Sequence, residues 1–130
     1  MPKAYRNPTT ILIENGALIK IVDWARSVKA KKILLVLGGN SFRASAHFGE
    51  LKRALSGCEC EASVPVSENP EISFVKEFSQ RYRPGSFDCV IGIGGGSAID
   101  TAKITAALLA SEAGALDEYL KLKKPFNRRL

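Results

Sequence analysis

The apolar residues of the chain fall into short continuous runs separated by longer segments of mixed polarity. Two of the runs, ILLVL and CVIGI, are almost entirely apolar, as strands buried on both faces of a parallel sheet must be. The pattern therefore predicts two central strands, and two further runs predict two more. The four predicted strands cover residues 10–13, 32–37, 61–66 and 89–93.

The segments between the runs repeat their apolar residues every three or four positions, which is typical of amphipathic helices. Strands that alternate with helices indicate right-handed crossovers, which place helices on the two faces of a parallel sheet. The sequence therefore predicts an α/β fold, a doubly wound and mostly parallel sheet with helices on both faces. We expect Trp24 and the phenylalanine stripe to belong to the core. The helical stripes are Leu18, Val22, Ala25 and Val28, then Phe48, Leu51 and Leu55, and then Phe74, Phe78 and Tyr82.

The composition sets the protein class. A chain of 130 residues that is 45% hydrophobic fits one globular domain. No apolar run approaches the roughly 20 residues that span a bilayer, and the first ten residues lack the apolar stretch of a signal peptide. We therefore expect a cytoplasmic protein without a membrane partner. Cys58, Cys60 and Cys89 lack metal-site spacing and are expected to be free thiols, and the single histidine, His47, is expected to lie on the surface.

The net charge of +6 would attract any anion, including nucleic acid or a phosphorylated cofactor. The basic residues are not interleaved with aromatic residues that could stack on bases, so a solvated surface is favoured and no nucleic-acid partner is expected. The basic residues gather at Lys29, Lys31 and Lys32 and in a tail with Lys121, Lys123, Lys124, Arg128 and Arg129.

The most informative segment is CVIGIGGGSAIDTAK, a buried strand followed by three glycines and a predicted helix. Glycines let a ligand approach the backbone closely, and the first turn of a helix offers unpaired amide groups, so the combination is suited to a phosphate. A tight strand-to-helix turn without a ligand would also explain Gly94, Gly95 and Gly96. The spacing departs from the dinucleotide fingerprint, because Ser97 stands where the third glycine is expected, and no Gly-Lys-Ser/Thr of a P-loop follows.

The same segment resembles the signature GGGSxxDxAK of the iron-containing alcohol dehydrogenases, and the similarity extends over nearly the whole chain. The resemblance implies that Gly95, Gly96 and Ser97 bind the pyrophosphate of NAD or NADP, and that Asn69 lines the cofactor cleft. In that family a separate helical C-terminal domain supplies an Asp and three His ligands to Fe or Zn. We therefore expect residues 1–130 to be an NAD(P)-binding α/β domain, incomplete at its C-terminal end, without a catalytic or metal-binding residue.

Asp100 and Lys103 of the signature are three residues apart, so on a helix they share a face. The family has this aspartate near the cofactor and substrate cleft. Compensation of charge near the helix end is the alternative interpretation, and the sequence leaves both open.

The end of the second predicted strand bears on the choice of nicotinamide cofactor. A carboxylate there would bind the adenosine 2′-hydroxyl and repel a 2′-phosphate. The chain instead has the neutral residues Gly38, Gly39, Asn40 and Ser41, with Arg43 nearby. NADP is therefore expected to be tolerated and favoured over NAD, although these residues could also form only a turn and a helix cap.

Two functions from different classes agree with the sequence. In the first, the chain is part of a dehydrogenase that transfers a hydride between NAD(P) and a small alcohol or aldehyde, with no turnover by these 130 residues alone. In the second, it is a non-catalytic nucleotide-binding or partner-binding module, which could form a homo-oligomer through exposed apolar area.

Overall fold

The computed structural model describes residues 9–112, 114 and 117. The basic residues between 121 and 129 that were noted in the sequence lie outside these described residues. Helices and strands alternate along the chain, as the apolar pattern predicts. In chain order the elements are α1 (Ala17–Ser27), β1 (Lys32–Leu37), α2 (Asn40–Arg43), α3 (Ala46–Ala54), β2 (Glu59–Ala62), α4 (Ile72–Tyr82), the 3-10 helix η1 (Arg83–Gly85), β3 (Cys89–Ile93) and α5 (Gly96–Leu109).

Within the described residues the sheet has three strands in the order β2-β1-β3. Both pairs are parallel, so the carboxyl ends of the strands meet at one edge of the sheet. The register sets Ile33 of β1 opposite Cys60 of β2 and Cys89 of β3. β1 is therefore the central strand, as its continuous apolar run predicts.

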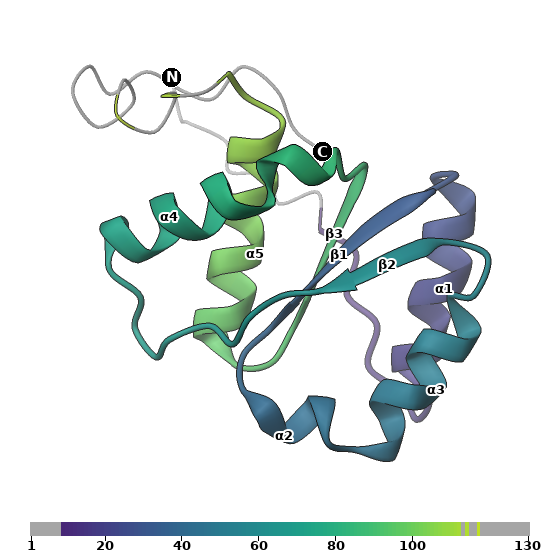
Figure 1. Cartoon of the computed structure of the whole chain (residues 1–130). Coiled ribbons are helices and arrows are strands. Elements are labelled where there is room, and N and C mark those ends of the chain that lie inside the picture. The colour runs from purple at the N-terminus through teal and green to yellow at the C-terminus, as the bar shows by residue number, and fades with distance from the viewer. Residues whose placement is uncertain (1–8, 113, 115–116, 118–130) are drawn as a thin grey trace, which may run out of the picture.

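The helices cover both faces of this sheet (Figure 1). On one face α1 and α3 pack on Ile33, Leu35 and Leu37 of β1. On the other face α4 and α5 pack on Leu34 and Val36. All five of these side chains are fully buried, at 0% exposure. The alternation of β1 side chains between two apolar layers confirms the predicted doubly wound α/β fold.

The predicted helical stripes supply most of the helix side of each layer. Val22 and Ala25 of α1 and Leu51 of α3 are buried in the first layer, and Phe78 and Tyr82 of α4 in the second. The prediction was wrong at the outer side of α1, because Trp24 is 49% exposed and Val28 is 51% exposed. Trp24 follows the buried Val22 by two positions, which rotates its side chain away from the sheet.

The strand predicted at residues 10–13 is not present. Ile11, Leu12 and Ile13 are 73%, 50% and 91% exposed, and the described residues provide no neighbouring strand for them. A strand needs a partner for its backbone hydrogen bonds, so an apolar run without one does not form it.

The strand predicted at residues 61–66 is shifted in the structure, where β2 spans Glu59–Ala62. Ser63 ends it, because its side-chain hydroxyl accepts a hydrogen bond from the Leu37 amide at 3.1 Å. A side chain thus replaces the backbone acceptor that a longer strand would supply. Among the described residues, no helix is both long and apolar enough to cross a membrane.

Candidate functional site

The residues predicted to bind a cofactor lie on the loops at the carboxyl edge of the sheet and on the helices α2 and α5 that follow two of these loops. The loops after β1 and β3 are joined by a hydrogen bond from the Gly38 amide to the Ile93 carbonyl, at 3.2 Å. The loop after β2 joins them because the Asn69 amide donates to the Ser97 hydroxyl at 3.0 Å. The structure therefore brings Gly38, Asn69 and Ser97 together from segments that are far apart in the sequence.

Gly94 is required by the fold. Its φ is 146°, a conformation that residues with a side chain rarely adopt. A Cβ atom at this position would lie 2.9 Å from the Cβ of Ala98 and 3.3 Å from the Cα of Gly38. The turn from β3 into α5 thus passes too close to both neighbours for any other residue.

Gly95 and Gly96 are different, because the fold would accept a side chain at either position. A Cβ atom at Gly95 or Gly96 would meet nothing within 4 Å. Gly95 has an ordinary φ of −77°, and both residues are exposed. The strand-to-helix turn therefore explains Gly94 but not the two glycines that follow it.

The positive potential at the N-terminus of α5 is not compensated by a side-chain cap or by an acidic residue in the first turn. The first amide groups of a helix have no intrahelical acceptor, and the helix dipole adds positive potential there. Gly95 makes no side-chain cap, and the first turn of α5 contains no acidic residue. An anion resting on Gly95 and Gly96 would thus meet free amide donors without a competing carboxylate.

Asn69 is held in an unusual conformation beside this helix start. Its φ is 45°, in the left-handed region, and Pro70 follows it. A residue before proline favours the extended region, and asparagine in the left-handed region is disfavoured by about 1 kcal/mol. The hydrogen bond from its amide to Ser97 is a restraint that opposes this strain.

Several contacts fix the loop that carries Asn69, and the sequence did not reveal them. The Val66 amide donates to the Leu37 carbonyl at 2.9 Å, and the Val64 amide donates to the Tyr82 hydroxyl at 2.7 Å. The Arg43 guanidinium donates to the Ser63 carbonyl. The one available signal was Ser63, a polar residue inside a predicted buried strand.

The loop after β1 presents small and neutral groups at the same edge. Gly39, Asn40 and Ser41 are exposed, and a Cβ atom at Gly39 would meet nothing within 4 Å. Asn40 begins α2 without a side-chain cap from Gly39. The Arg43 guanidinium points to the Ser63 carbonyl, so one of its nitrogen atoms is already engaged inside the protein.

Asp100 and Lys103 lie on the exposed side of α5, beyond Ser97. The Lys103 Nζ is 3.8 Å from the Asp100 Oδ1, and the two side chains are 73% and 70% exposed. Such an exposed pair contributes little to stability. The structure thus confirms that they share a helix face, and both side chains remain accessible.

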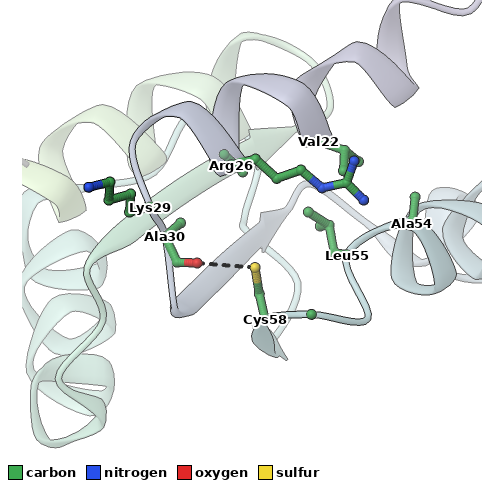
Figure 2. A pocket seen from close by; sticks show the side chains of 9 residues that line it. Val22, Arg26, Lys29, Ala30, Ala54, Leu55 and Cys58 are labelled. Atoms are coloured by element: carbon green, nitrogen blue, oxygen red, sulfur yellow. Dashed lines mark hydrogen bonds between the residues drawn. The ribbon is translucent and has the colours of Figure 1, made fainter.

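A cavity lies at the opposite end of the sheet from these loops. It has a volume of about 250 Å³ and lies between α1, α3 and the segment before β2 (Figure 2). The Cys58 thiol donates to the Ala30 carbonyl at 3.2 Å across it. The cavity contains none of the predicted site residues. It is lined by Val22, Ala25, Arg26, Lys29, Ala30, Ala54, Leu55, Gly57 and Cys58.

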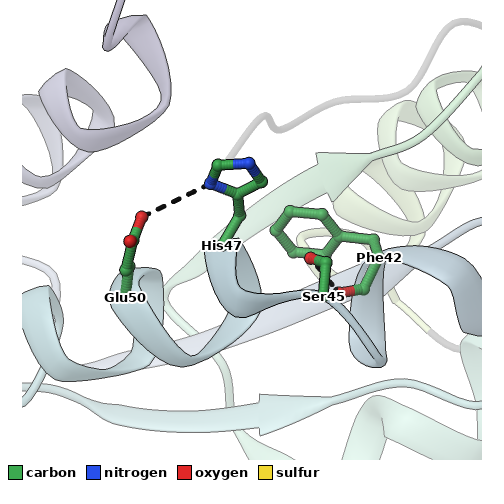
Figure 3. Close-up of polar contacts among 4 residues, drawn as sticks. All are labelled: Phe42, Ser45, His47 and Glu50. Carbon is green, nitrogen blue, oxygen red and sulfur yellow. Dashed lines mark hydrogen bonds and ion pairs between the residues drawn. The ribbon is translucent and has the colours of Figure 1, made fainter.

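His47 lies at the surface, as predicted. Its Nδ1 is 3.4 Å from the Glu50 Oε2 on α3, and the two side chains are 70% and 49% exposed (Figure 3). Within residues 9–112, 114 and 117, no group of three or more His, Cys, Asp or Glu residues could hold a metal ion.

The three cysteines are free thiols, and two of them are shielded. Burial, and then the neighbouring charges of Asp88, Cys58 and Cys60, raise the pKa of Cys89 to about 11. Burial, followed by Cys58, raises the pKa of the Cys60 thiol, although Lys52 opposes the shift. Cys60 and Cys89 are therefore poor nucleophiles at neutral pH.

Comparison with known proteins matches residues 8–130 to the family described as iron-containing alcohol dehydrogenase. The chain is 58% identical over 112 residues to long-chain-alcohol dehydrogenase 1 of Geobacillus thermodenitrificans, an alignment that covers 82% of this chain and 27% of that protein. It is 37% identical over 99 residues to the long-chain primary alcohol dehydrogenase AdhA of Thermoanaerobacter ethanolicus, covering 72% of this chain and 25% of the relative.

A solved structure agrees with these relatives. The NADH-dependent butanol dehydrogenase A of Thermotoga maritima matches with a TM-score of 0.85 and 27% identity, over 99% of this chain and 33% of that one. The chain thus spans between a quarter and a third of the length of the proteins that it matches.

Proposed function

This chain belongs to the iron-containing alcohol dehydrogenase family, and we propose that its 130 residues form the part of such an enzyme that binds the nicotinamide cofactor. The complete enzyme would transfer a hydride between NAD(P) and a small alcohol or aldehyde. The proposal concerns binding by the chain itself. The residues that it assigns lie at the carboxyl edge of the sheet, where open α/β sheets hold their ligands.

One observation carries this proposal. Gly95 and Gly96 have room for a side chain, yet they leave the backbone bare in front of the uncapped start of α5. Gly95 is the N-cap of α5, where Ser, Asp or Asn would supply a side-chain cap that glycine lacks. A cofactor pyrophosphate that approaches the backbone within hydrogen-bonding distance would account for both residues.

Different groups of the predicted residues would contact different parts of the cofactor. The amide groups at Gly95, Gly96 and Ser97 would hold the pyrophosphate, and Asn69 would lie along the same side of the dinucleotide. Gly38, Gly39, Asn40 and Ser41 would face the adenosine ribose. Asp100 and Lys103 would line the edge nearest the alcohol substrate.

The choice between NAD and NADP follows from the loop after β1. The residues from 38 to 41 carry no carboxylate that would repel a 2′-phosphate, and the net charge of +6 favours the more anionic cofactor. Arg43 is a weaker candidate for the 2′-phosphate than its sequence position indicates, because its guanidinium donates to Ser63. We therefore propose that NADP is accepted and favoured, because of the neutral loop and the net positive charge rather than because of Arg43.

The metal of the family does not fit the described residues. They contain no group of three possible ligands, and the whole chain has a single histidine. When bound, a metal cation would polarise the alcohol or carbonyl oxygen. Residues other than the described ones would have to supply its ligands, so we propose no catalytic residue in this chain.

The test is a fluorescence titration of the folded chain with NADPH and with NADH. We expect both to bind, NADPH more tightly, and Gly95→Val to weaken both by at least about tenfold because its side chain occupies the pyrophosphate position. Gly57→Val is the matched control, since a Cβ atom at Gly57 also meets nothing within 4 Å and the residue lies at the other end of the sheet. Equal losses in the two variants would contradict the proposal.

The alternative function, a non-catalytic module that binds another partner, makes a different prediction. A folded chain that binds neither nucleotide but self-associates through the exposed Ile11, Leu12 and Ile13 would support it. Sedimentation of the same protein sample used for the titration distinguishes the two functions.

A further inference from the structure

The loop after β2 crosses the carboxyl edge of the sheet before α4 begins. β2 is an edge strand, and α4 packs on the face that it shares with α5. Figure 1 shows this segment leaving β2, passing the start of α5 and then turning up to α4. Val66 fixes the loop to the end of β1, and Asn69 fixes it to Ser97 at the start of α5.

We propose that Ser97 is a positioning residue, whose hydroxyl holds Asn69 against the cofactor in addition to any contact of its own. The inference rests on the proposed cofactor function and assigns a new task to one of its residues. Its basis is the 3.0 Å hydrogen bond in which the Asn69 amide donates and the Ser97 Oγ accepts.

The direction of this hydrogen bond leaves the Ser97 hydroxyl proton available. A hydroxyl has one proton and two acceptor lone pairs, and the Asn69 amide occupies one lone pair. The described part of the chain shows no acceptor for the proton. A single side chain can therefore restrain the loop and still donate to a pyrophosphate oxygen, and the restraint exists before the cofactor arrives.

Asn69 needs such a restraint because its backbone is not in a relaxed conformation. Its φ of 45° precedes Pro70, which favours extended conformations at the preceding residue. Without the Ser97 acceptor, the backbone would relax toward the extended region and rotate the Asn69 carboxamide away from α5. Removal of the serine hydroxyl should therefore abolish the contribution of Asn69 to cofactor binding.

A double-mutant cycle with Ser97→Ala and Asn69→Gly tests this coupling. Glycine at position 69 keeps the amide donor and adopts a positive φ freely, so this variant removes the carboxamide and relieves the backbone strain without losing the hydrogen bond to Ser97. Ser97→Thr keeps the hydroxyl as a conservative control, and Ser67→Ala removes a serine of the same loop. The measurements are the NADH dissociation constant and the exchange rate of the Asn69 amide proton, the latter without cofactor.

We expect Ser97→Ala to weaken NADH binding about tenfold, the size of one good hydrogen bond, and Ser97→Thr to restore binding to within about threefold of the original protein. Asn69→Gly should weaken binding several-fold in the original protein and less than about twofold in the Ser97→Ala background. The Asn69 amide should exchange at least about tenfold faster in Ser97→Ala, and Ser67→Ala should change neither quantity.

The outcomes separate the two proposals. If the losses from Asn69→Gly and Ser97→Ala simply multiply, or if Ser97→Ala leaves the Asn69 amide protected, the positioning role is wrong while the cofactor function stands. If the unaltered chain binds neither NADH nor NADPH, the proposed function fails and the positioning role fails with it.

Discussion

The residues of the glycine run differ in what the fold requires of them. The fold requires glycine at position 94, since the positive φ and the short distances to Ala98 and Gly38 exclude a side chain. Gly95 and Gly96 satisfy no requirement of the fold, because the space around them is open. The sequence alone could not distinguish a tight turn from a ligand site here. The structure shows that Gly94 makes the turn and that the next two glycines leave the backbone accessible.

The first prediction compares two of these glycines. Gly94→Ala should lower the free energy of unfolding by about 1–3 kcal/mol, because the new Cβ is strained and clashes with Ala98. Gly95→Ala should leave it unchanged to within about 0.5 kcal/mol. Urea unfolding followed by circular dichroism measures both. A stability loss at Gly95 equal to that at Gly94 would show that the whole run serves the turn.

The second prediction concerns the reactivity of Cys89. Its pKa of about 11 lies above the ordinary value of 9.0, so the thiol keeps its proton between these two pH values in the folded protein and loses it in the unfolded one. At pH 9 the thiolate fraction is roughly fiftyfold smaller in the folded protein, and alkylation should slow by at least that factor. Mass spectrometry after iodoacetamide treatment, with and without urea, gives both rates. Equal rates would mean that the thiol is not shielded.

At the scale of elements, the close packing of β3 against α5 supports the site. A Cβ atom at Gly92 would lie 2.6 Å from the Cβ of Ala102, so this pair needs both a glycine and a small residue. Arg83 from η1 donates to the carbonyls of Leu108 and Ser111, at 2.6 and 2.9 Å, and thereby closes the far end of α5. The contact of Ala102 with Gly92 and the hydrogen bonds from Arg83 therefore fix the middle and the C-terminal end of α5. Neither contact involves the first turn of the helix, where the ligand is proposed to bind.

The sequence predicted correctly the bounds of the strands that are buried on both faces and therefore consist of continuous apolar runs. The central strand β1 and the strand β3 were correct in their bounds, because both are continuous apolar runs. Residues 10–13 have the same apolar character and form no strand, since pairing depends on neighbours that a local pattern does not contain. The observed end of β2 differs from the predicted end for a similar reason. Ser63 ends the strand by accepting a hydrogen bond from Leu37, which is 26 residues away in the sequence.

The sequence nominated candidate residues for the site, but it did not predict the contacts between them. The resemblance to the family signature and its flanking segments nominated both Ser97 and Asn69. The hydrogen bond between them depends on the crossing of the loop after β2, which only the strand order determines. Coupling between the two residues therefore had no signal in the sequence.

At the scale of the whole molecule, cofactor binding and metal chemistry should be separable. The residues proposed to bind the cofactor lie at one edge of the sheet, whereas the described part of the chain contains no group of three possible metal ligands. The third prediction follows from this separation. EDTA, or added Fe²⁺ or Zn²⁺, should change the NADPH dissociation constant of the 130-residue chain by less than about twofold, and none of them should produce alcohol oxidation.

The measurement combines the fluorescence titration with an absorbance assay of NADPH formation from butanol, in which a full-length family member serves as the positive control. A lower NADPH dissociation constant with metal present would mean that residues of this chain help to bind the ion. That result would contradict the prediction, which rests on the absence of a group of three possible ligands among the described residues. Alcohol oxidation by the chain alone would contradict the prediction more strongly. It would mean that Asp100, Lys103 or the accessible loops polarise the substrate oxygen without a metal ion.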